Sequence, residues 1–213
     1  MPLQPTADKK TSHGPNAPRD WETQYREDDV ETMPWFYAAL DADVEKALTH
    51  YSHNITSALD LGAGAASQAI ALAKRGVRVT ATDIAHSAMQ KAAMRAHHEG
   101  VSIHCQQDDI LQSTLTDHFD LIIDRGCFHC ISGDARQTYV EKVHQLTNPQ
   151  GWLLLKTFHI DETGKEGPPN RYHPDDIARI FGSHFELIDA YTTIFHGSRD
   201  CAPIALFSIL RKK

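Results

Sequence analysis

From residue 55 onward, short apolar segments alternate with longer segments whose apolar residues recur at helical spacing. Alternating or continuous apolar residues over four to eight positions predict strands, and a spacing of three to four predicts amphipathic helices. The predicted strands are 55–60, 77–83, 101–107, 119–124, 151–158, 185–191 and 204–211. The predicted helices among them are 65–76, 86–100, 134–146 and 174–182.

This alternation predicts an α/β fold with a mostly parallel sheet and helices on both faces, because parallel strands need crossover helices. The segment 119–124, FDLIID, is apolar on both faces, which is typical of a central parallel strand. The last two strands follow one another without a helical segment between them. We therefore expect an antiparallel hairpin at one edge of the sheet.

Local signals place several boundaries. Asp134 with Gln137 predicts a capping box for the helix at 134–146, and NPQG at 148–151 predicts a turn. A long loop rich in Gly and Pro is expected at 161–174, and its length suggests a functional role. Upstream, DADVEKALTH at 41–50 predicts a short helix.

Three parts of the chain differ in composition. Residues 1–18 are polar and rich in Pro, which predicts a disordered tail. Residues 19–54 carry Trp, Tyr and Phe in a polar background and predict a helical, aromatic cap. Residues 55–213 then form the α/β domain.

Composition restricts the partners. The net charge is −7 and there is no basic stripe, which argues against a nucleic-acid partner. No apolar run approaches the ~20 residues that span a bilayer, and the start of the chain lacks the apolar region of a secretory signal. We therefore expect a cytoplasmic protein with reduced cysteines and no membrane partner.

Glycines and acids cluster where the predicted strands end. Gly62 and Gly64 follow the first strand, where glycine lets a ligand approach the backbone at a helix start. Asp60 precedes them, Asp83 ends the second strand, and Asp108 and Asp109 end the third. An acid at the end of each of three successive strands predicts a nucleoside pocket. Each acid taken alone could equally be a helix cap or a solvated side chain.

An NAD site is the competing interpretation of this glycine turn. The dinucleotide fingerprint requires a third Gly or Ala, and Ser67 stands at that position here. Asp60 also places negative charge where a pyrophosphate would approach, which favours a ligand with a cationic end.

The segments ALDLGAGAASQAIALAKRG, VTATD, DDIL, FDLIIDRG and NPQGWLLLKTF resemble the successive motifs of class I S-adenosylmethionine-dependent methyltransferases. The resemblance covers about residues 20 to 211 and implies that family's Rossmann-like fold with a seven-stranded sheet. PWFY, DRGCFH and GPPNRYHP resemble the small-molecule group that includes thiopurine and tellurite-resistance methyltransferases.

The resemblance also implies roles for matching positions. Asp60, Gly62 and Gly64 would contact the methionine part of S-adenosylmethionine. The residues implied for the other parts are Asp83 for the ribose, Ile84 against the adenine, Asp109 or Asp108 for the adenine amino group with Ile110 beside it, and Asp124 with Arg125 near the sulfonium.

The acceptor would lie just past the fourth strand. His129 is the first candidate general base and Asp124 the second, although His129 could instead pack on the following helix. Arg125 could orient an anionic acceptor or pair with a nearby carboxylate. Further candidates for acceptor binding are Trp35 in the aromatic cap and Arg171 and Tyr172 in the long loop, each of which could equally serve packing or lie in solvent.

The fourth strand leads into DRGCFHC, where Cys127 and Cys130 form a Cys-x-x-Cys pair. A structural zinc site needs four ligands, and no second pair stands at a useful spacing. The order of strands and helices also differs from that of a thioredoxin-like redox fold. We therefore expect no metal and no redox role.

The sequence thus predicts an S-adenosylmethionine-dependent methyltransferase acting on a small molecule, either a thiol, selenium or tellurium acceptor or a small metabolite. The alternatives are an NAD-dependent oxidoreductase and a non-catalytic protein that binds S-adenosylmethionine. The acceptor's identity and the oligomeric state stay open.

Overall fold

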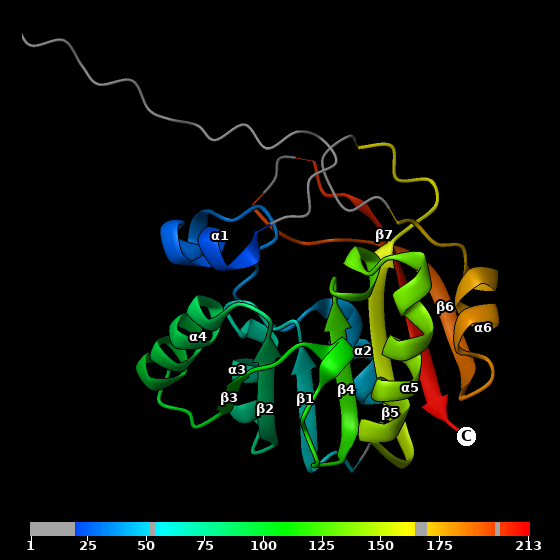
Figure 1. Ribbon diagram of the computed structural model, residues 1–213, viewed down its shortest axis with the longest axis horizontal. Helices are drawn as coiled ribbons and strands as arrows, with labels where there is room; N and C mark the ends of the chain where they lie inside the picture. The colour runs from blue at the N-terminus through cyan, green and yellow to red at the C-terminus, as the bar shows by residue number, and fades with distance from the viewer. Residues whose placement is uncertain (1–19, 52–53, 165–169, 199–200) are drawn as a thin grey trace, which may run out of the picture.

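A computed structural model describes residues 20–51, 54–164, 170–198 and 201–213. Its centre is a seven-stranded sheet in the order β3-β2-β1-β4-β5-β7-β6 (Figure 1). The strands are β1 Ser57–Leu61, β2 Arg78–Asp83, β3 His104–Gln107, β4 Phe119–Arg125, β5 Thr147–Phe158, β6 Phe185–Ile194 and β7 Ile204–Lys212.

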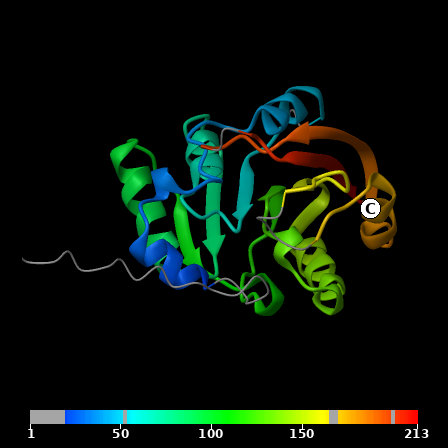
Figure 2. The same cartoon turned by 90° about the horizontal axis from the view of Figure 1, so that it is seen from above.

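Helices cover both faces of this sheet, as the view in Figure 2 shows for α2 and α5. The α-helices are α1 Trp21–Glu27, α2 Ala42–Tyr51, α3 Ser67–Ala73, α4 His86–His98, α5 Arg136–Leu146 and α6 Pro174–Phe181. The 3-10 helices are η1 Val30–Thr32, η2 Ile110–Gln112, η3 Phe128–Cys130 and η4 Gly133–Ala135. The described residues form three apolar clusters, one beneath α2, α3 and α4, one beneath α5 and α6, and a small one of Phe158, Phe195 and Ala205.

Strand directions confirm the predicted topology. β1 pairs in parallel with β2 and β4, and β4 pairs in parallel with β5. β7 pairs antiparallel with both β5 and β6, which makes the reversed C-terminal pair. A central strand buried on both faces has little room for polar side chains, and Leu121, Ile122 and Ile123 of β4 are fully buried.

Two local predictions were wrong. The predicted capping box of Asp134 and Gln137 is absent, since Asp134 lies in the 3-10 helix η4. Helix α5 begins at Arg136, and its N-cap Ala135 makes no side-chain hydrogen bond. The NPQG turn is instead a bulge inside β5, where the register with β4 shifts and Gln150 has a φ of 63°. In both places the sheet and the helix packing outweigh the local turn signal.

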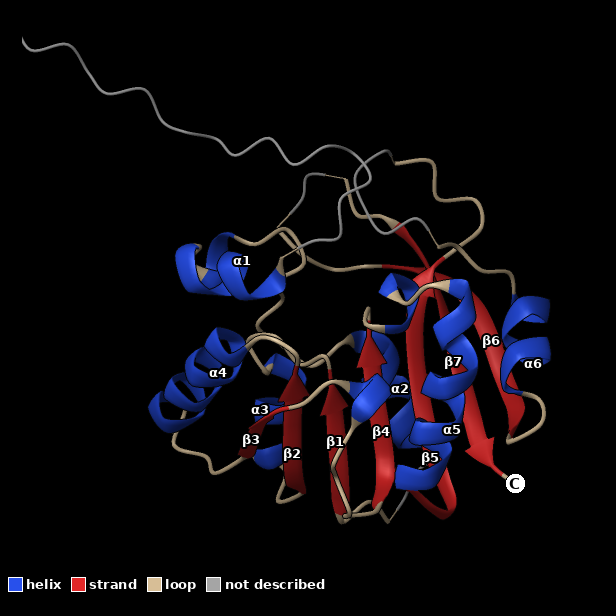
Figure 3. Cartoon of the chain, viewed as in Figure 1, coloured by secondary structure: helices blue, strands red, loops and turns tan. Residues whose placement is uncertain are grey.

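The carboxyl ends of the parallel strands lie together at one end of the sheet, and α1 lies beyond that end, above α4 (Figure 3). Helix α1 is tied to α4 because the Glu22 carboxylate accepts hydrogen bonds from the Ser87 backbone N–H at 3.1 Å and from its hydroxyl at 2.6 Å. The aromatic segment, residues 20–51, thus packs on the sheet. The domain boundary between residues 54 and 55 stays a prediction. The tail predicted for residues 1–18 lies outside the described residues, as does part of the loop at 161–174.

Candidate active site

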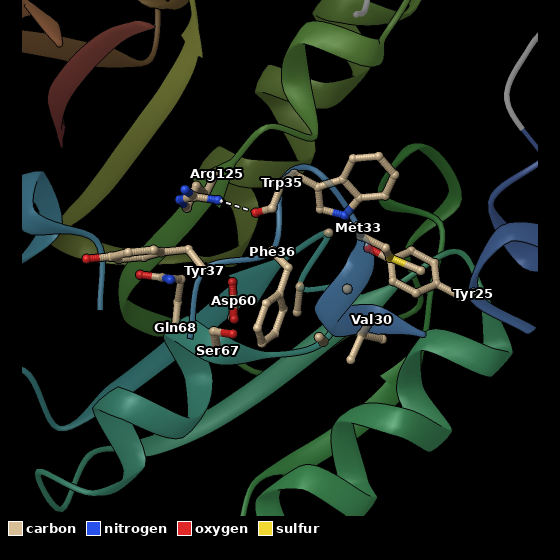
Figure 4. Close-up of a pocket in the computed structure, with 14 residues that line it drawn as sticks. Tyr25, Val30, Met33, Trp35, Phe36, Tyr37, Asp60, Ser67, Gln68 and Arg125 are labelled. Atoms are coloured by element: carbon tan, nitrogen blue, oxygen red, sulfur yellow. Dashed lines mark hydrogen bonds between the residues drawn. The ribbon is translucent and has the colours of Figure 1, made fainter. Parts of the chain in front are cut away.

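A pocket lies between the glycine turn after β1 and the aromatic segment above it (Figure 4). It encloses about 480 Å³ when its opening is included. Its lining residues are Tyr25, Val30, Met33, Trp35, Phe36, Tyr37, Asp60, Gly62, Ala63, Gly64, Ala65, Ser67, Gln68 and Arg125. The pocket therefore combines an aromatic roof with a polar floor of backbone and carboxylate groups.

The floor depends on glycine. Gly62 and Gly64 have φ values of 64° and 51°, in the left-handed region that other residues rarely adopt. A Cβ at Gly62 would lie 2.7 Å from the Cβ of Cys127, and a Cβ at Gly64 would collide with the Tyr25 hydroxyl. Glycine is therefore required at both positions for two reasons: the backbone conformation is left-handed, and a neighbouring side chain leaves no room for a Cβ.

Asp60 lies buried at the end of β1. One of its carboxylate oxygens accepts a hydrogen bond from the backbone N–H of Ala69 in α3 at 2.9 Å. Burial raises the pKa of Asp60 to about 7, although that hydrogen bond and Arg125 oppose the rise. An acid of this kind gains its charge most readily when a cationic group binds beside it.

Asp83, at the end of β2, holds the glycine turn. Its two oxygens accept from the N–H groups of Gly64 and Ala85, each at 2.9 Å. Burial raises its pKa, and these two hydrogen bonds oppose the rise. The side chain of Ile84 next to it is 52% exposed, which is unusual for an isoleucine and leaves an apolar surface beside the acid.

Asp108 and Asp109 follow β3. The backbone N–H of Asp108 donates to the carbonyl of Asp83 at 3.0 Å, which brings the ends of β2 and β3 together. The Asp108 side chain accepts from the N–H of Thr114, and Asp109 caps η2 by accepting from the N–H of Leu111. Ile110 is buried in the core.

Asp124, at the end of β4, is fully buried and fully engaged. Its carboxylate accepts from the Tyr139 hydroxyl at 2.6 Å and from three backbone N–H groups, those of Gly126, Cys127 and Phe128. Burial raises its pKa to about 6 against the opposing pull of these donors. The carboxylate therefore shapes the turn that carries His129.

Arg125 donates three hydrogen bonds. Its Nε donates to Asp41 Oδ2 at 2.8 Å, and its terminal nitrogens donate to the carbonyls of Trp35 and His196. Pairing with a carboxylate was one of the two alternatives for Arg125, and it is the one found in this arrangement.

His129 lies in η3 with its ring stacked on Phe158, the two centroids 4.6 Å apart and the planes 10° apart. Phe195 packs edge-on against it. Burial lowers the pKa of His129 to about 3, and its Nδ1 has no hydrogen-bond partner within the described part of the chain. The imidazole is therefore neutral across the physiological pH range.

Of the three remaining candidates for acceptor binding, one lines the pocket and two do not. Trp35 lines the pocket, and its indole N–H donates to the Tyr25 hydroxyl at 3.1 Å. Arg171 instead donates to the carbonyls of Glu162 and Gly164 and so folds its own loop. Tyr172 is 2% exposed and stacks on Phe128 in the core. Neither Arg171 nor Tyr172 lines the pocket.

Sequence reasoning missed several residues at this site, among them Tyr25, Gln68 and Asp41. Gln68 sits in an otherwise apolar helix, and a buried polar residue there was a usable signal. Asp41 gave no local signal, because its partners Arg125 and Lys156 lie more than 80 residues away in the chain.

The four cysteines are free. Burial raises the pKa of the Cys127 thiol well above its ordinary value, so the thiol stays protonated. Across residues 20–51, 54–164, 170–198 and 201–213, no group of three or more His, Cys, Asp or Glu is placed to hold a metal ion. In the same ranges no helix is long and apolar enough to cross a membrane.

Residues 58–151 match the family model described as a methyltransferase domain. An uncharacterized methyltransferase of Schizosaccharomyces pombe is 30% identical over 108 residues, which cover 50% of this chain and 73% of that protein. A thiopurine S-methyltransferase of Vibrio parahaemolyticus is 31% identical over 65 residues, 30% of each chain.

Solved structures share the fold. One comes from work on the conversion of a disulfide bond into a thioacetal group during echinomycin biosynthesis. It has a TM-score of 0.79 at 18% identity, and the match covers 91% of this chain and 90% of that protein. The 1,6-didemethyltoxoflavin-N1-methyltransferase of Burkholderia thailandensis, with bound 1,6-didemethyltoxoflavin and S-adenosylhomocysteine, has a TM-score of 0.72 at 23% identity and covers 91% and 86%. At these identities the likeness concerns the fold alone.

Proposed function

This chain belongs to the class I S-adenosylmethionine-dependent methyltransferases, and from that premise we propose that it methylates a small molecule whose acceptor atom is a soft nucleophile such as a thiolate. Family membership removes the NAD-dependent oxidoreductase and the non-catalytic binding protein as leading alternatives. The cytoplasmic location stays a prediction.

The residues present suit the cofactor. The turn at Gly62 and Gly64 leaves its backbone open to a ligand, and Asp60 offers a buried carboxylate to a cationic amino group. Asp83 with exposed Ile84 offers an acid and an apolar surface side by side, which suits a ribose and a base. When bound, S-adenosylmethionine supplies an already activated methyl group.

One observation carries the choice of acceptor: neither of the two candidate bases, His129 and Asp124, is placed to take a proton from it. His129 is neutral with a pKa of about 3, so it is a very weak base at neutral pH. Asp124 already accepts four hydrogen bonds, and Arg125 is paired with Asp41. Hydroxyl and amine acceptors must lose a proton as they are methylated and so need a base in reach, whereas a thiolate, selenide or reduced tellurium anion has no proton to lose.

In this proposal the protein's contribution is alignment and exclusion of water. The aromatic rings of Trp35, Phe36 and Tyr37 cover the pocket, and His129 with Phe158 would form an uncharged aromatic wall on the acceptor side. The similarity to a thiopurine S-methyltransferase supports a sulfur acceptor. The toxoflavin enzyme's name specifies nitrogen, so the experiment must separate the two chemistries.

The test uses labelled S-adenosylmethionine at saturating concentration and two acceptor thiols whose own pKa values differ by about two units. We expect the pH at which kcat/KM for the acceptor reaches half its maximum to move with the pKa of the thiol. An inflection that stays at one pH for both thiols would mean that the enzyme supplies the base, and would overturn the proposal.

Matched hydroxyl and amine analogues of the two thiols serve as controls. We expect the rates for these analogues to be lower by at least about a hundredfold, because a general base usually contributes that much to the rate. Equal rates for the amine analogue would contradict a soft acceptor while leaving the family assignment intact.

A further inference from the structure

Four charged side chains are clustered beside the pocket. Lys156 of β5, which is 1% exposed, donates to both oxygens of Asp41 at 2.8 and 2.9 Å and to Asp43 Oδ2 at 2.6 Å. Arg125 of β4, the register partner of Lys156, binds the other side of Asp41. Two positive and two negative charges thus balance in the interior.

Asp41 connects this cluster to two residues that line the pocket. Its carboxylate bridges β4 and β5, and its backbone N–H donates to Gln68 Oε1 of α3 at 2.8 Å. Gln68 and Arg125 both line the pocket. Burial opposes the charge of Asp41, but Lys156 and Arg125 outweigh it and hold its pKa below the ordinary value.

Asp41 also ends the stretch that roofs the pocket, residues 33–41, here called the cap segment. Met33, Trp35, Phe36 and Tyr37 of the cap segment line the pocket. Arg125, once paired with Asp41, donates to the Trp35 carbonyl and to the His196 carbonyl. One guanidinium therefore joins the cap segment to the connection between β6 and β7, where the His196 ring stacks on Tyr37.

Asp43 offers a contrast within the same cluster. It binds Lys156 and accepts from the Thr193 hydroxyl at 2.8 Å, but it contacts neither Arg125 nor Gln68. Both aspartates compensate the buried Lys156, and removing either leaves an imperfectly paired charge, which is strongly destabilising. They differ in that only Asp41 binds Arg125 and Gln68, the two neighbours that line the pocket.

We propose that Asp41 is a positioning residue for the methyl transfer, which aligns Arg125 and Gln68 so that the cap segment stays closed over the bound cofactor. This inference rests on the proposed function only in requiring that the cofactor bind in this pocket. Loss of the Asp41 charge frees Arg125, loosens the Trp35 carbonyl and opens the roof, so the cofactor leaves faster.

The experiment compares Asp41→Asn with the matched variant Asp43→Asn in the full chain. The probe is S-adenosylhomocysteine, with its dissociation rate measured by surface plasmon resonance and its Kd by calorimetry. We expect Asp41→Asn to raise the dissociation rate about tenfold, since changes at one interface act mainly on that rate, and Asp43→Asn to change it less than about twofold. Both should lower the melting temperature, Asp41→Asn the more, because Asp41 pairs with two cations and Asp43 with one.

A role in stability alone would move both melting temperatures and leave both dissociation rates unchanged, or change the two rates equally, and either result overturns the proposal. Should Asp41→Asn fail to fold, Arg125→Lys keeps the positive charge beside Asp41 and removes the fork that reaches two carbonyls. The expected dissociation rate for Arg125→Lys is again raised about tenfold, and an unchanged rate contradicts the positioning role.

Failure of the two proposals can be told apart. A wild-type chain that binds no S-adenosylhomocysteine contradicts the cofactor pocket itself. A wild-type chain that binds it normally and methylates a hard acceptor contradicts only the acceptor class, and the comparison of Asp41 with Asp43 still stands.

Discussion

At the scale of single residues, the site depends on acids held in the interior at the carboxyl ends of β1, β2 and β4. Asp60, Asp83 and Asp124 are each 8% exposed or less, and burial raises the pKa of each. Backbone N–H groups donate to each of them, and none forms an ion pair within the described residues. A ligand that brings positive charge therefore finds carboxylates not yet paired with one.

Asp60 should make cofactor binding depend on pH. Its pKa of about 7 means that the unliganded chain must lose a proton there to hold the cationic amino group. We expect the affinity for S-adenosylhomocysteine to be constant above pH 7.5 and to fall as the pH drops below 7, by about tenfold per unit. Calorimetry between pH 5.5 and 8.5 measures this.

The variant Asp60→Asn is the control, since it removes the titrating group. Its affinity should be weaker at pH 8 and nearly independent of pH. An equally steep fall in Asp60→Asn would assign the proton to another group. In the unliganded chain, the raised pKa of Asp60 also means that its contribution to stability is present below pH 4 and lost as the pH rises through 7.

Gly64→Ala should weaken cofactor binding beyond its effect on stability. Gly64 and Gly100 both have positive φ, so alanine strains either position by about 1 kcal/mol. At Gly64 the new methyl group also meets the Tyr25 hydroxyl, whereas at Gly100 it meets open space. We expect Gly64→Ala to lose more stability in urea than Gly100→Ala, and only Gly64→Ala to lose affinity for S-adenosylhomocysteine, by tenfold or more. Equal affinities of Gly64→Ala and Gly100→Ala for S-adenosylhomocysteine would contradict this prediction and mean that Tyr25 moves aside for the methyl group.

At the scale of elements, Asp120 fastens the start of β1 to β4 and β5. One of its oxygens accepts from the N–H groups of Thr56 and Ser57 and from the Thr56 hydroxyl, and the other accepts from Asn148 at 2.8 Å. These donors outweigh partial burial and lower the pKa of Asp120 to about 2. The bulge at the start of β5, which the sequence did not predict, brings Asn148 to this carboxylate.

Asp120→Ala should destabilise the fold by about 2–4 kcal/mol, because several charge-assisted hydrogen bonds are lost and backbone donors are left unpaired. Since the folded pKa is lowered, this stabilisation is present above pH 4 and is lost as the pH falls towards 2. Urea denaturation of both proteins at pH 7 and pH 3 measures it, and their difference should shrink at pH 3.

Asp117→Ala is the matched control, because Asp117 is an exposed carboxylate in the segment just before β4. It should change the free energy of unfolding by less than about 0.5 kcal/mol. A loss for Asp120→Ala that is equally small at pH 7 would mean that these hydrogen bonds are readily replaced by water.

At the scale of the whole molecule, the pocket lies between the sheet and the aromatic segment, and a ligand there contacts both. A ligand at a hundred times its Kd stabilises the folded state by about 2.7 kcal/mol, which corresponds to roughly 5–10 °C in melting temperature for a chain of this size. We expect this shift with S-adenosylmethionine or S-adenosylhomocysteine and none with NAD. A shift with NAD alone would contradict the cofactor assignment.

Much of the fold was predictable, since it depends on patterns that persist along the chain. The seven strands, their mostly parallel order and the reversed C-terminal pair follow from strand and helix periodicity and from the absence of a helix before β7. The errors at Asp134 and NPQG were local, where packing against a neighbouring strand or turn outweighed a short signal.

At the site, the sequence by itself determined which groups the strand ends carry, Asp60, Gly62, Gly64 and Asp83, because a βα turn places them within a few residues of the strand. Only the tertiary structure decided how Asp124, Arg125 and His129 are engaged. Their partners, Tyr139, Asp41 and Phe158, come from distant parts of the chain, and burial then fixes which charges persist. Charge and exposure depend on what surrounds a group in space, which spacing along a chain does not encode.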